Sequence, residues 1–193
     1  MSDQPAWPRV QVRAAEPATT VVLVEGESDR AALVTLAARL GRDFDAEGVH
    51  VVVLGGATNI GPVLRRLRAT RRGVRVAGLC DAGEAPCFRR ALATTGAMEA
   101  HGFFVCDADL EDELIRAMGV EEVEALLDAH GELELFRTFQ RQPAQRGRRR
   151  EEQLRRFLGT KSGRKIRYGT LLAGAVDLAG IPQPLARLLA HLG

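Results

Sequence analysis

The sequence has little that would suit an exported, membrane-spanning or zinc-binding protein. No stretch approaches the roughly 18 consecutive apolar residues that a membrane span needs, and residues 1–20 contain no apolar signal core. The three cysteines, Cys80, Cys87 and Cys106, form no CxxC pair and have no Cys/His spacing, so neither a zinc site nor a disulfide framework is implied. We therefore expect a cytoplasmic protein that has no membrane partner.

Motifs of several enzyme classes are also missing from the sequence. The segment GTKSGRK at 159–165 lacks the first glycine of GxxxxGKS/T, so the chain has no P-loop of its own. No GxSxG string of a serine hydrolase occurs. The four histidines, His50, His101, His130 and His191, have no ligand spacing to one another. Serine-nucleophile chemistry and a histidine-based metal site are therefore not indicated.

Charge is nearly balanced overall but unevenly distributed. The 193 residues, 46% apolar and 27% charged, suit a globular protein with one main core, and the net charge is only +2. The segment 137–167 nevertheless holds twelve Lys or Arg and two Glu, whereas 107–134 is rich in Asp and Glu. Cations that hold a nucleic-acid backbone beside carboxylates that hold metal would explain this pattern. A solvated basic helix is the alternative.

Hydrophobic periodicity divides the chain into an α/β part and a helical part. Strands are expected at 21–25, 49–54, 74–80 and 102–106, with helices at 28–40, 58–71 and 85–94. This alternation predicts βαβ units and a mostly parallel sheet flanked by helices. From Leu110 onward, helices are expected at 110–118, 123–127, 133–140, 154–158, 168–179 and within 181–192. The polar segment 142–150 is interpreted as a linker or mobile loop.

Acidic side chains follow three of the predicted strands. Glu25 ends the first strand and Asp29 lies in the next helical turn, Asp81 ends the third strand, and Asp109 and Glu111 follow the fourth. Because the carboxyl ends of parallel strands share one sheet edge, where ligands bind in open α/β sheets, we expect these carboxylates to converge. Oxygen ligands of this kind suit Mg²⁺ or Mn²⁺.

Each acidic residue also has a simpler explanation. The helix dipole favours Asp29 in the first turn of a helix, and capping favours Asp109 at a helix start. Glu25 and Asp81 would serve equally as exposed strand ends or turn residues. The placement of three clusters at one edge favours a shared site, and we expect Gly26 to permit the tight turn that brings Glu25 and Asp29 together.

Lysine is scarce in this sequence. Lys161 and Lys165 are the only two in a chain that otherwise uses arginine. A lysine retained against such a bias suggests a compact charge at a specific place, such as beside a scissile phosphate. An ordinary exposed lysine is the alternative.

The strings EGESD, with Glu25 and Asp29, and LCD, with Asp81, resemble the signature of the TOPRIM domain. This domain is shared by type IA and type II topoisomerases, bacterial primases, RNase M5-like maturases and OLD-family nucleases. The OLD (overcoming lysogenization defect) branch is the most similar, because its D-L-E element and extension lysine are matched by 109–111 and Lys165. We therefore divide the chain into a flexible leader at 1–18, a Rossmann-like TOPRIM catalytic core at 19–115 and a helical extension with a basic segment at 116–193.

The resemblance implies a DNA endonuclease or nickase that uses two Mg²⁺ or Mn²⁺ ions. Glu25 and Asp29 would hold one metal and Asp81 would be shared, while Asp109 and Glu111 would hold the second. Glu25 would also take part in proton transfer. Lys165 would neutralise the charge that develops on the phosphate.

Two features depart from the family pattern. The usual DxD pair reads Asp81-Ala82-Gly83, so the second Asp is missing, and Glu84 is the nearest substitute ligand. OLD proteins also carry an N-terminal ABC-type ATPase, which this sequence lacks. We therefore expect a stand-alone TOPRIM protein, with any ATP gating supplied by a separate ATPase protein.

Nucleic acid, and DNA rather than RNA, is the expected partner. The arginines between Arg137 and Arg156 would contact the backbone without reading sequence. The side chains assigned to this role are Arg141, Arg148, Arg149, Arg150, Lys161 and Arg164. Tyr168, the only tyrosine, lies in the helical extension, so topoisomerase chemistry is not expected. An RNA-processing TOPRIM hydrolase, or a non-catalytic module that binds nucleic acid or an ATPase, is the alternative.

Overall fold

The computed structural model describes residues 19–70 and 73–193. The expected leader at 1–18 lies outside the described residues, as does Arg71, the expected last residue of a helix. Within the described part of the chain, no helix is both long enough and apolar enough to cross a membrane.

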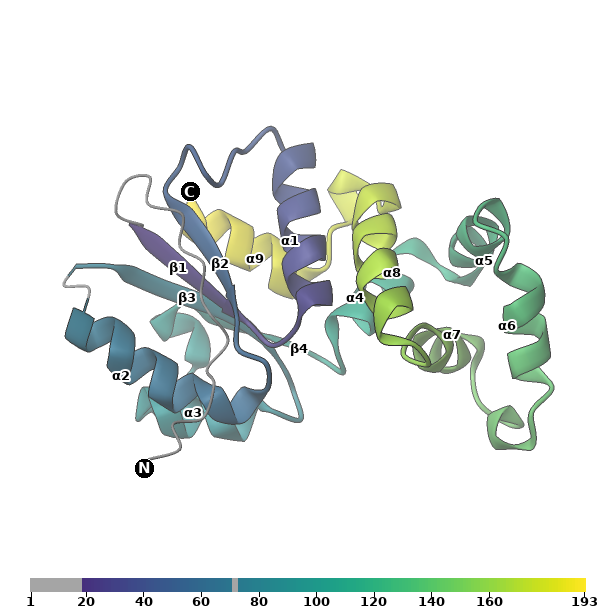
Figure 1. The fold of residues 1–193 in the computed structure, drawn as a ribbon, viewed down its shortest axis with the longest axis horizontal. Coiled ribbons are helices and arrows are strands. Elements are labelled where there is room, and N and C mark those ends of the chain that lie inside the picture. The colour runs from purple at the N-terminus through teal and green to yellow at the C-terminus, as the bar shows by residue number, and fades with distance from the viewer. Residues whose placement is uncertain (1–18, 71–72) are drawn as a thin grey trace, which may run out of the picture.

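Four strands form one parallel sheet at the centre of the fold (Figure 1). They are β1 Thr20–Val24, β2 Val49–Val53, β3 Arg75–Asp81 and β4 Phe103–Cys106, in the spatial order β2-β1-β3-β4. All three pairings are parallel. β1 is buried at every position, which is typical of a central parallel strand covered on both faces. The predicted α/β architecture with a parallel sheet is confirmed.

Helices cover both faces of this sheet (Figure 1). Those of the first part of the chain are α1 Glu27–Arg39, α2 Ile60–Thr70 and α3 Ala85–Leu92. Val22 and Val24 of β1 point into a large core that includes α1, whereas Val21 and Leu23 point into a second core that includes α2 and α3. Because successive side chains of a strand face opposite sides, a strand between two cores must be apolar throughout.

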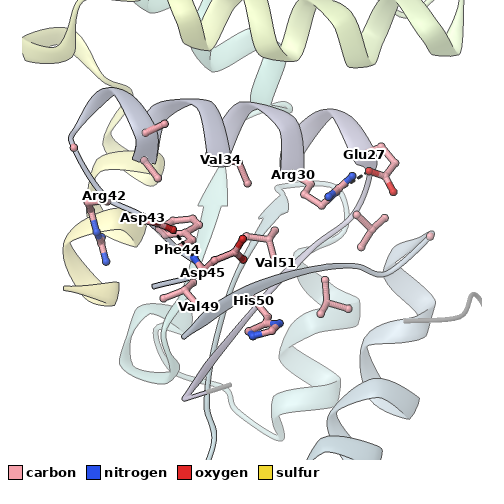
Figure 2. Close-up of a pocket in the computed structure, with 16 residues that line it drawn as sticks. Glu27, Arg30, Val34, Arg42, Asp43, Phe44, Asp45, Val49, His50 and Val51 are labelled. Carbon is pink, nitrogen blue, oxygen red and sulfur yellow. Dashed lines mark hydrogen bonds and ion pairs between the residues drawn. The ribbon is translucent and has the colours of Figure 1, made fainter. Parts of the chain in front are cut away.

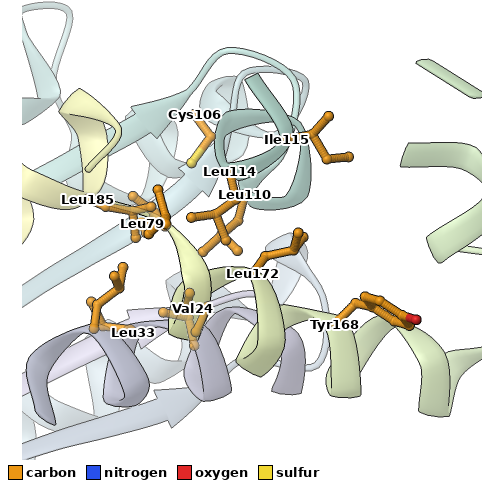
Figure 3. Close-up of a cluster of buried hydrophobic side chains, with 14 of the residues drawn as sticks. Val24, Leu33, Leu79, Cys106, Leu110, Leu114, Ile115, Tyr168, Leu172 and Leu185 are labelled. Carbon is orange, nitrogen blue, oxygen red and sulfur yellow. The ribbon is translucent and has the colours of Figure 1, made fainter. Parts of the chain in front are cut away.

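The C-terminal half is helical and returns to the sheet at its end. Its helices are α4 Leu110–Met118, α5 Val120–Ala129, α6 Leu133–Gln140, α7 Arg150–Leu158, α8 Ser162–Ala175 and α9 Gln183–Leu192. α8 packs along α1, and α9 packs against β3 and β4, whereas α5, α6 and α7 lie beyond the end of the sheet (Figure 1). Leu172 and Leu185 share the large core with Val24 and Leu79 (Figure 3).

Single-turn helices connect several of these elements. They are Ala57–Asn59, Met98–His101, Pro143–Gln145 and Leu178–Gly180. One of them, Pro143–Gln145, lies within 142–150, the segment expected to be a linker or mobile loop, which connects α6 to α7. Gln145 is buried, and its carbonyl oxygen accepts a hydrogen bond from Gln153 Nε2 at 2.9 Å. A side chain from α7 thus satisfies the backbone of a segment that looks solvent-exposed from its polarity alone.

The bounds of α8 also differ from those predicted at 168–179. Arg39 of α1 donates from Nη1 to the carbonyl oxygens of Ala173 at 2.8 Å and Val176 at 2.6 Å. These bonds satisfy carbonyl groups that lack a partner at a helix C-terminus. α8 therefore ends where a cation from another helix caps it, and it begins early enough to include Lys165 in its first turn.

Candidate functional site

The carboxyl ends of β1 and β3 meet at Glu25 and Asp81. The backbone amide of Asp81 donates to Glu25 Oε1 at 3.0 Å, which links the two strand ends directly. Asp29, in the first turn of α1, accepts a hydrogen bond from the Gly26 amide at 2.8 Å. Gly26 has φ −136°, an extended backbone that other residues also adopt, so the turn at this position does not depend on the conformational freedom of glycine.

Burial and mutual repulsion both raise the pKa values of these carboxylates. Burial, and after it the charges of Glu25, Asp29 and Asp109, raise the pKa of Asp81 to about 8 against the opposing effect of Lys165. Burial likewise raises the pKa of Glu25 and of Asp29 above their usual ranges. A cation bound between the strand ends would relieve this repulsion.

The third acidic cluster divides into one satisfied carboxylate and one unsatisfied carboxylate. Asp109 caps α4: its Oδ1 accepts from the Asp112 amide at 2.8 Å, and its Oδ2 accepts from Arg155 Nε at 2.6 Å. Glu111 is only 1% exposed, and neither of its carboxylate oxygens accepts a hydrogen bond from the described residues. Lys165 Nζ lies 3.2 Å from Glu111 Oε2, at ion-pair distance. Glu111 therefore has the greater unmet need for a cation.

Lys165 provides the cation nearest to this cluster. Burial lowers the pKa of its ammonium group, but Glu111, Asp29 and Asp109 outweigh that effect and leave the pKa above its usual value. Gly169, one turn further along α8, explains why Lys165 lies at this place. A Cβ atom at Gly169 would lie 2.7 Å from the Ser28 carbonyl oxygen, so only glycine permits the observed approach of α8 to α1. This close contact places Lys165 beside the first turn of α1.

The missing Asp of the DxD pair leaves an open position at Gly83. A Cβ atom added there would meet no atom within 4 Å. Glu84 precedes α3, and its charge is one of the causes that raise the pKa of Glu25. The carboxylate of Glu84, the expected substitute ligand, therefore lies near enough to the site to affect the pKa of Glu25. This effect does not require Glu84 to be a metal ligand.

The donor set fits a hard divalent cation, although it does not form a finished coordination shell. In residues 19–70 and 73–193, no three His, Cys, Asp or Glu side chains are gathered closely enough to hold a metal ion as they stand. All of the converging groups are nevertheless carboxylates, the ligand type that Mg²⁺ and Mn²⁺ prefer. The unsatisfied buried oxygens of Glu111 and the repulsion at Asp81 are the two observations that favour a cation here.

Five of the six side chains expected to bind nucleic acid fall into three groups. Arg141, Arg149 and Lys161 are exposed. Arg148 forms an ion pair with Glu152 on α7. Arg150 lies 2.8 Å from both Glu121 and Glu124 of α5. The first group is available to a phosphate backbone, whereas the other two already have carboxylate partners.

Arg164 does not lie on the surface, which corrects its assignment to backbone contact. It is 9% exposed, its Nε donates to Glu132 Oε2 at 2.6 Å, and its guanidinium stacks 4.1 Å from the centre of the Phe157 ring. Arg137 is similarly engaged, because its Nη2 lies 2.6 Å from Glu124 Oε2. A long basic run on short helices necessarily turns some of its side chains inward.

Sequence reasoning missed the roles of Arg155 and Gly169. Arg155 appeared only as one arginine of a basic run, and nothing in its spacing predicts the bond to Asp109, 46 residues away. Gly169 carried a weak signal, because it follows Lys165 by four residues on one helix face. A glycine at that spacing indicates close approach by a neighbouring backbone.

Comparison with known proteins identifies the family to which this site is similar. Residues 18–82 match the family described as overcoming lysogenization defect protein-like, TOPRIM domain. No curated protein sequence matches the chain. Among solved structures, the C-terminal region of the Burkholderia pseudomallei OLD protein is 21% identical, with a TM-score of 0.64 over 91% of this chain and 96% of that chain. The same region of the Xanthomonas campestris pv. campestris OLD protein is 23% identical, with a TM-score of 0.64 over 91% and 94% of the two chains.

The matched segment includes the strand ends and the α1 turn that carry Glu25, Asp29 and Asp81. The similarity in fold extends well beyond that segment, into the helices of the C-terminal half. Residues 18–82 are therefore similar to the OLD-like TOPRIM domain, and the fold of the described chain is like that of the C-terminal region of OLD proteins.

Proposed function

We propose that the protein is a divalent-metal-dependent endonuclease or nickase that hydrolyses phosphodiester bonds of DNA. The observation that carries this proposal is that the electrostatically coupled carboxylates of Glu25, Asp29 and Asp81 lie at the carboxyl end of a parallel sheet, where Lys165 affects them and pairs with Glu111. Carboxylates at this sheet edge bind ligands in open α/β folds. The OLD-like TOPRIM similarity supports the same reaction class.

The carboxylates have distinct proposed roles. Glu25, Asp29 and Asp81 would hold one Mg²⁺ or Mn²⁺ ion, with Asp81 shared, and Glu111 would hold a second. Asp109 would contribute to the second site only if Arg155 released it, because both of its oxygens are engaged. When bound, the ions would stabilise the attacking and leaving oxygens of an in-line displacement.

Lys165 and the exposed basic side chains would position the substrate. The Lys165 ammonium is fully charged at neutral pH, since its pKa is raised, and it would neutralise charge on the scissile phosphate. Glu25 would accept a proton at the strand end, because its raised pKa brings it closer to neutral pH than an ordinary glutamate. Arg141, Arg149 and Lys161 would contact the backbone without reading sequence.

In the proposed enzyme, residues 19–115 form the TOPRIM core and residues 116–193 form a helical extension. The extension would supply Lys165 and the backbone contacts. A separate ATPase protein is the proposed regulatory partner, by analogy with OLD proteins, and a cytoplasmic location is part of the same proposal.

A non-catalytic module is the second candidate, and specific observations favour it. Gly83 removes one carboxylate, and Arg155 occupies another at Asp109. Such a module would bind nucleic acid or an ATPase without cleaving. A further alternative is an RNA-processing TOPRIM hydrolase, which would use the same site but cleave RNA in place of DNA.

Cleavage of supercoiled plasmid in Mg²⁺, Mn²⁺ and chelator tests the proposal. We expect metal-dependent nicking by the wild type and its loss in Glu25→Gln. Glu27→Gln is the matched control, because Glu27 is exposed on the same turn and pairs with Arg30, at 2.8 Å. Equal nicking by Glu25→Gln and wild type would reject the assigned site.

The same incubation with single-stranded DNA and with structured RNA separates the alternatives. Cleavage of RNA alone would identify the RNA-processing variant. No cleavage of any substrate, together with retained binding in a gel-shift assay, would establish the non-catalytic module.

A further inference from the structure

β2 forms an unprotected edge of the sheet. It pairs only with β1, so its other side has no strand partner among the described residues. Its sequence is VHVVV, with no lysine, proline or acidic residue. Natural proteins usually protect such an edge with charge, proline, a bulge or a cover. An uncharged edge of five residues therefore calls for something that pairs with it.

Two backbone amides of β2 point away from β1. The Leu54 amide donates to the Val24 carbonyl oxygen of β1 at 2.8 Å, and amides alternate in direction along a strand, so those of Val51 and Val53 face outward. Neither donates to a loop or a side chain in the described part of the chain. The outward amide of Val49 is already bonded to the Phe44 carbonyl oxygen at 2.7 Å.

A groove of about 1090 Å³ lies along this edge, between β2 and α1. Figure 2 shows Val34 of α1 and Val51 of β2 facing the groove between its two ends. Val34 is 45% exposed although it is a large apolar side chain. Its place at the middle of α1 matches the middle of the β2 edge.

The two ends of the groove carry opposite charges. Glu27 and Arg30, paired with each other, lie at the end near the carboxyl end of β2, and Arg30 is 51% exposed (Figure 2). Asp43 and Asp45 lie at the other end, near Val49, and Asp45 is exposed (Figure 2). Arg42 at that end is bonded to Glu47 and to the Leu189 carbonyl oxygen, so within the described residues it does not pair with either aspartate.

We propose that the β2 edge is a homodimer interface in which β2 pairs antiparallel with β2 of a second copy. A two-fold axis near Val52 would join the Val51 and Val53 amides of each copy to the Val53 and Val51 carbonyls of the other. The same axis lays the two α1 helices antiparallel, with Val34 facing its counterpart. Arg30 of each copy then faces Asp45 of the other. One operation thus gives partners to the two outward amides, to the exposed apolar side chain and to both charged ends.

Sedimentation of the 193-residue chain over a range of concentrations tests this interface. We expect a species of twice the 20.9 kDa chain mass, and Val34→Glu should shift it to the monomer, because two carboxylates would meet on the axis. Leu135→Glu is the matched control: Leu135 is 53% exposed on α6, away from the groove, and its replacement should leave the dimer intact.

A charge exchange tests the geometry of the pairing. Arg30→Glu and Asp45→Arg should each weaken dimerisation at least about tenfold, and the double variant should recover most of it, because the pair is restored in reversed order. Circular dichroism confirms that each variant folds. Hydrogen exchange should show the Val51 and Val53 amides protected in the dimer and exposed in the Val34→Glu monomer.

Three results would overturn the proposal. The first is a wild type that stays monomeric at all concentrations with rapidly exchanging Val51 and Val53 amides. The second is a dimer that Val34→Glu leaves intact, which would place the interface on another face. The third is a monomer with protected β2 amides, which would mean that another part of the same chain, or a different partner, covers the edge.

Discussion

At the scale of single residues, Asp81 is the group most affected by its neighbours. Its pKa is raised from 3.8 to about 8, first by burial and then by Glu25, Asp29 and Asp109. Between about pH 4 and pH 8, the folded protein therefore keeps a proton on Asp81 that the unfolded chain has already released. The stability that this bound proton contributes is present below pH 4 and is lost as the pH rises through about 8.

Asp81→Asn should consequently stabilise the metal-free protein, and more so at pH 9 than at pH 5. Thermal denaturation measures the effect: each gain of about 1 kcal/mol raises Tm by about 2–4 °C in a chain of this size. Asp128→Asn, at an exposed site on α5, should show no such pH dependence. A stabilisation by Asp81→Asn that is equal at pH 5 and pH 9 would contradict the assigned repulsion.

Gly83→Asp restores the second carboxylate of the family pattern without a steric obstacle, because no atom lies within 4 Å of the new Cβ. We expect Mn²⁺ to bind roughly tenfold more tightly, a change of about 1.4 kcal/mol in binding free energy. Isothermal titration with Mn²⁺ measures it. Ala82→Asp adds the same charge one residue earlier, so an equal gain in that variant would indicate a general charge effect instead of a ligand.

At the scale of secondary-structure elements, the contact between α8 and α1 decides where Lys165 lies. Gly169→Ala would place a methyl group 2.7 Å from the Ser28 carbonyl oxygen, so the helices must separate. We expect a loss of about 1–3 kcal/mol in the free energy of unfolding. Chemical denaturation measures this loss, and a plasmid-nicking assay should show reduced cleavage because Lys165 moves with α8.

Gly174→Ala on the same helix is the control for Gly169→Ala. Its new Cβ would meet only the Thr35 methyl carbon at 4.0 Å, so the higher helix propensity of alanine should leave stability unchanged or raise it by about 0.5–1 kcal/mol. Equal destabilisation by the two variants would show that the close approach at Ser28 is unimportant.

At the scale of the whole molecule, the exposed basic side chains of the helical half should set the salt dependence of DNA binding. Arg149→Gln with Lys161→Gln removes two phosphate contacts, which should lower the slope of log K against log salt by about 1.8. Fluorescence anisotropy with a duplex at several salt concentrations measures the slope. Arg65→Gln with Arg68→Gln makes the same charge change on α2, which covers the face of the sheet opposite α1. This double variant should leave the slope unchanged.

The sequence by itself determined the α/β architecture, the parallel sheet and the order of its acidic strand ends. The valine-rich strands alternate with amphipathic helices, and this local periodicity is sufficient to place Glu25 and Asp81 at one edge. The bounds of the strands were predicted to within about one residue for the same reason.

Only the tertiary structure decided which charged groups meet. It satisfied Asp109 with Arg155, left Glu111 unsatisfied beside Lys165, and buried Arg164 against Glu132. These partners are separated by 46, 54 and 32 residues of sequence. Hydrophobic periodicity in the sequence indicates which face of a helix is apolar. The pairing of charges depends instead on how closely two helices pack. Between α1 and α8, that distance is set by a single glycine, Gly169.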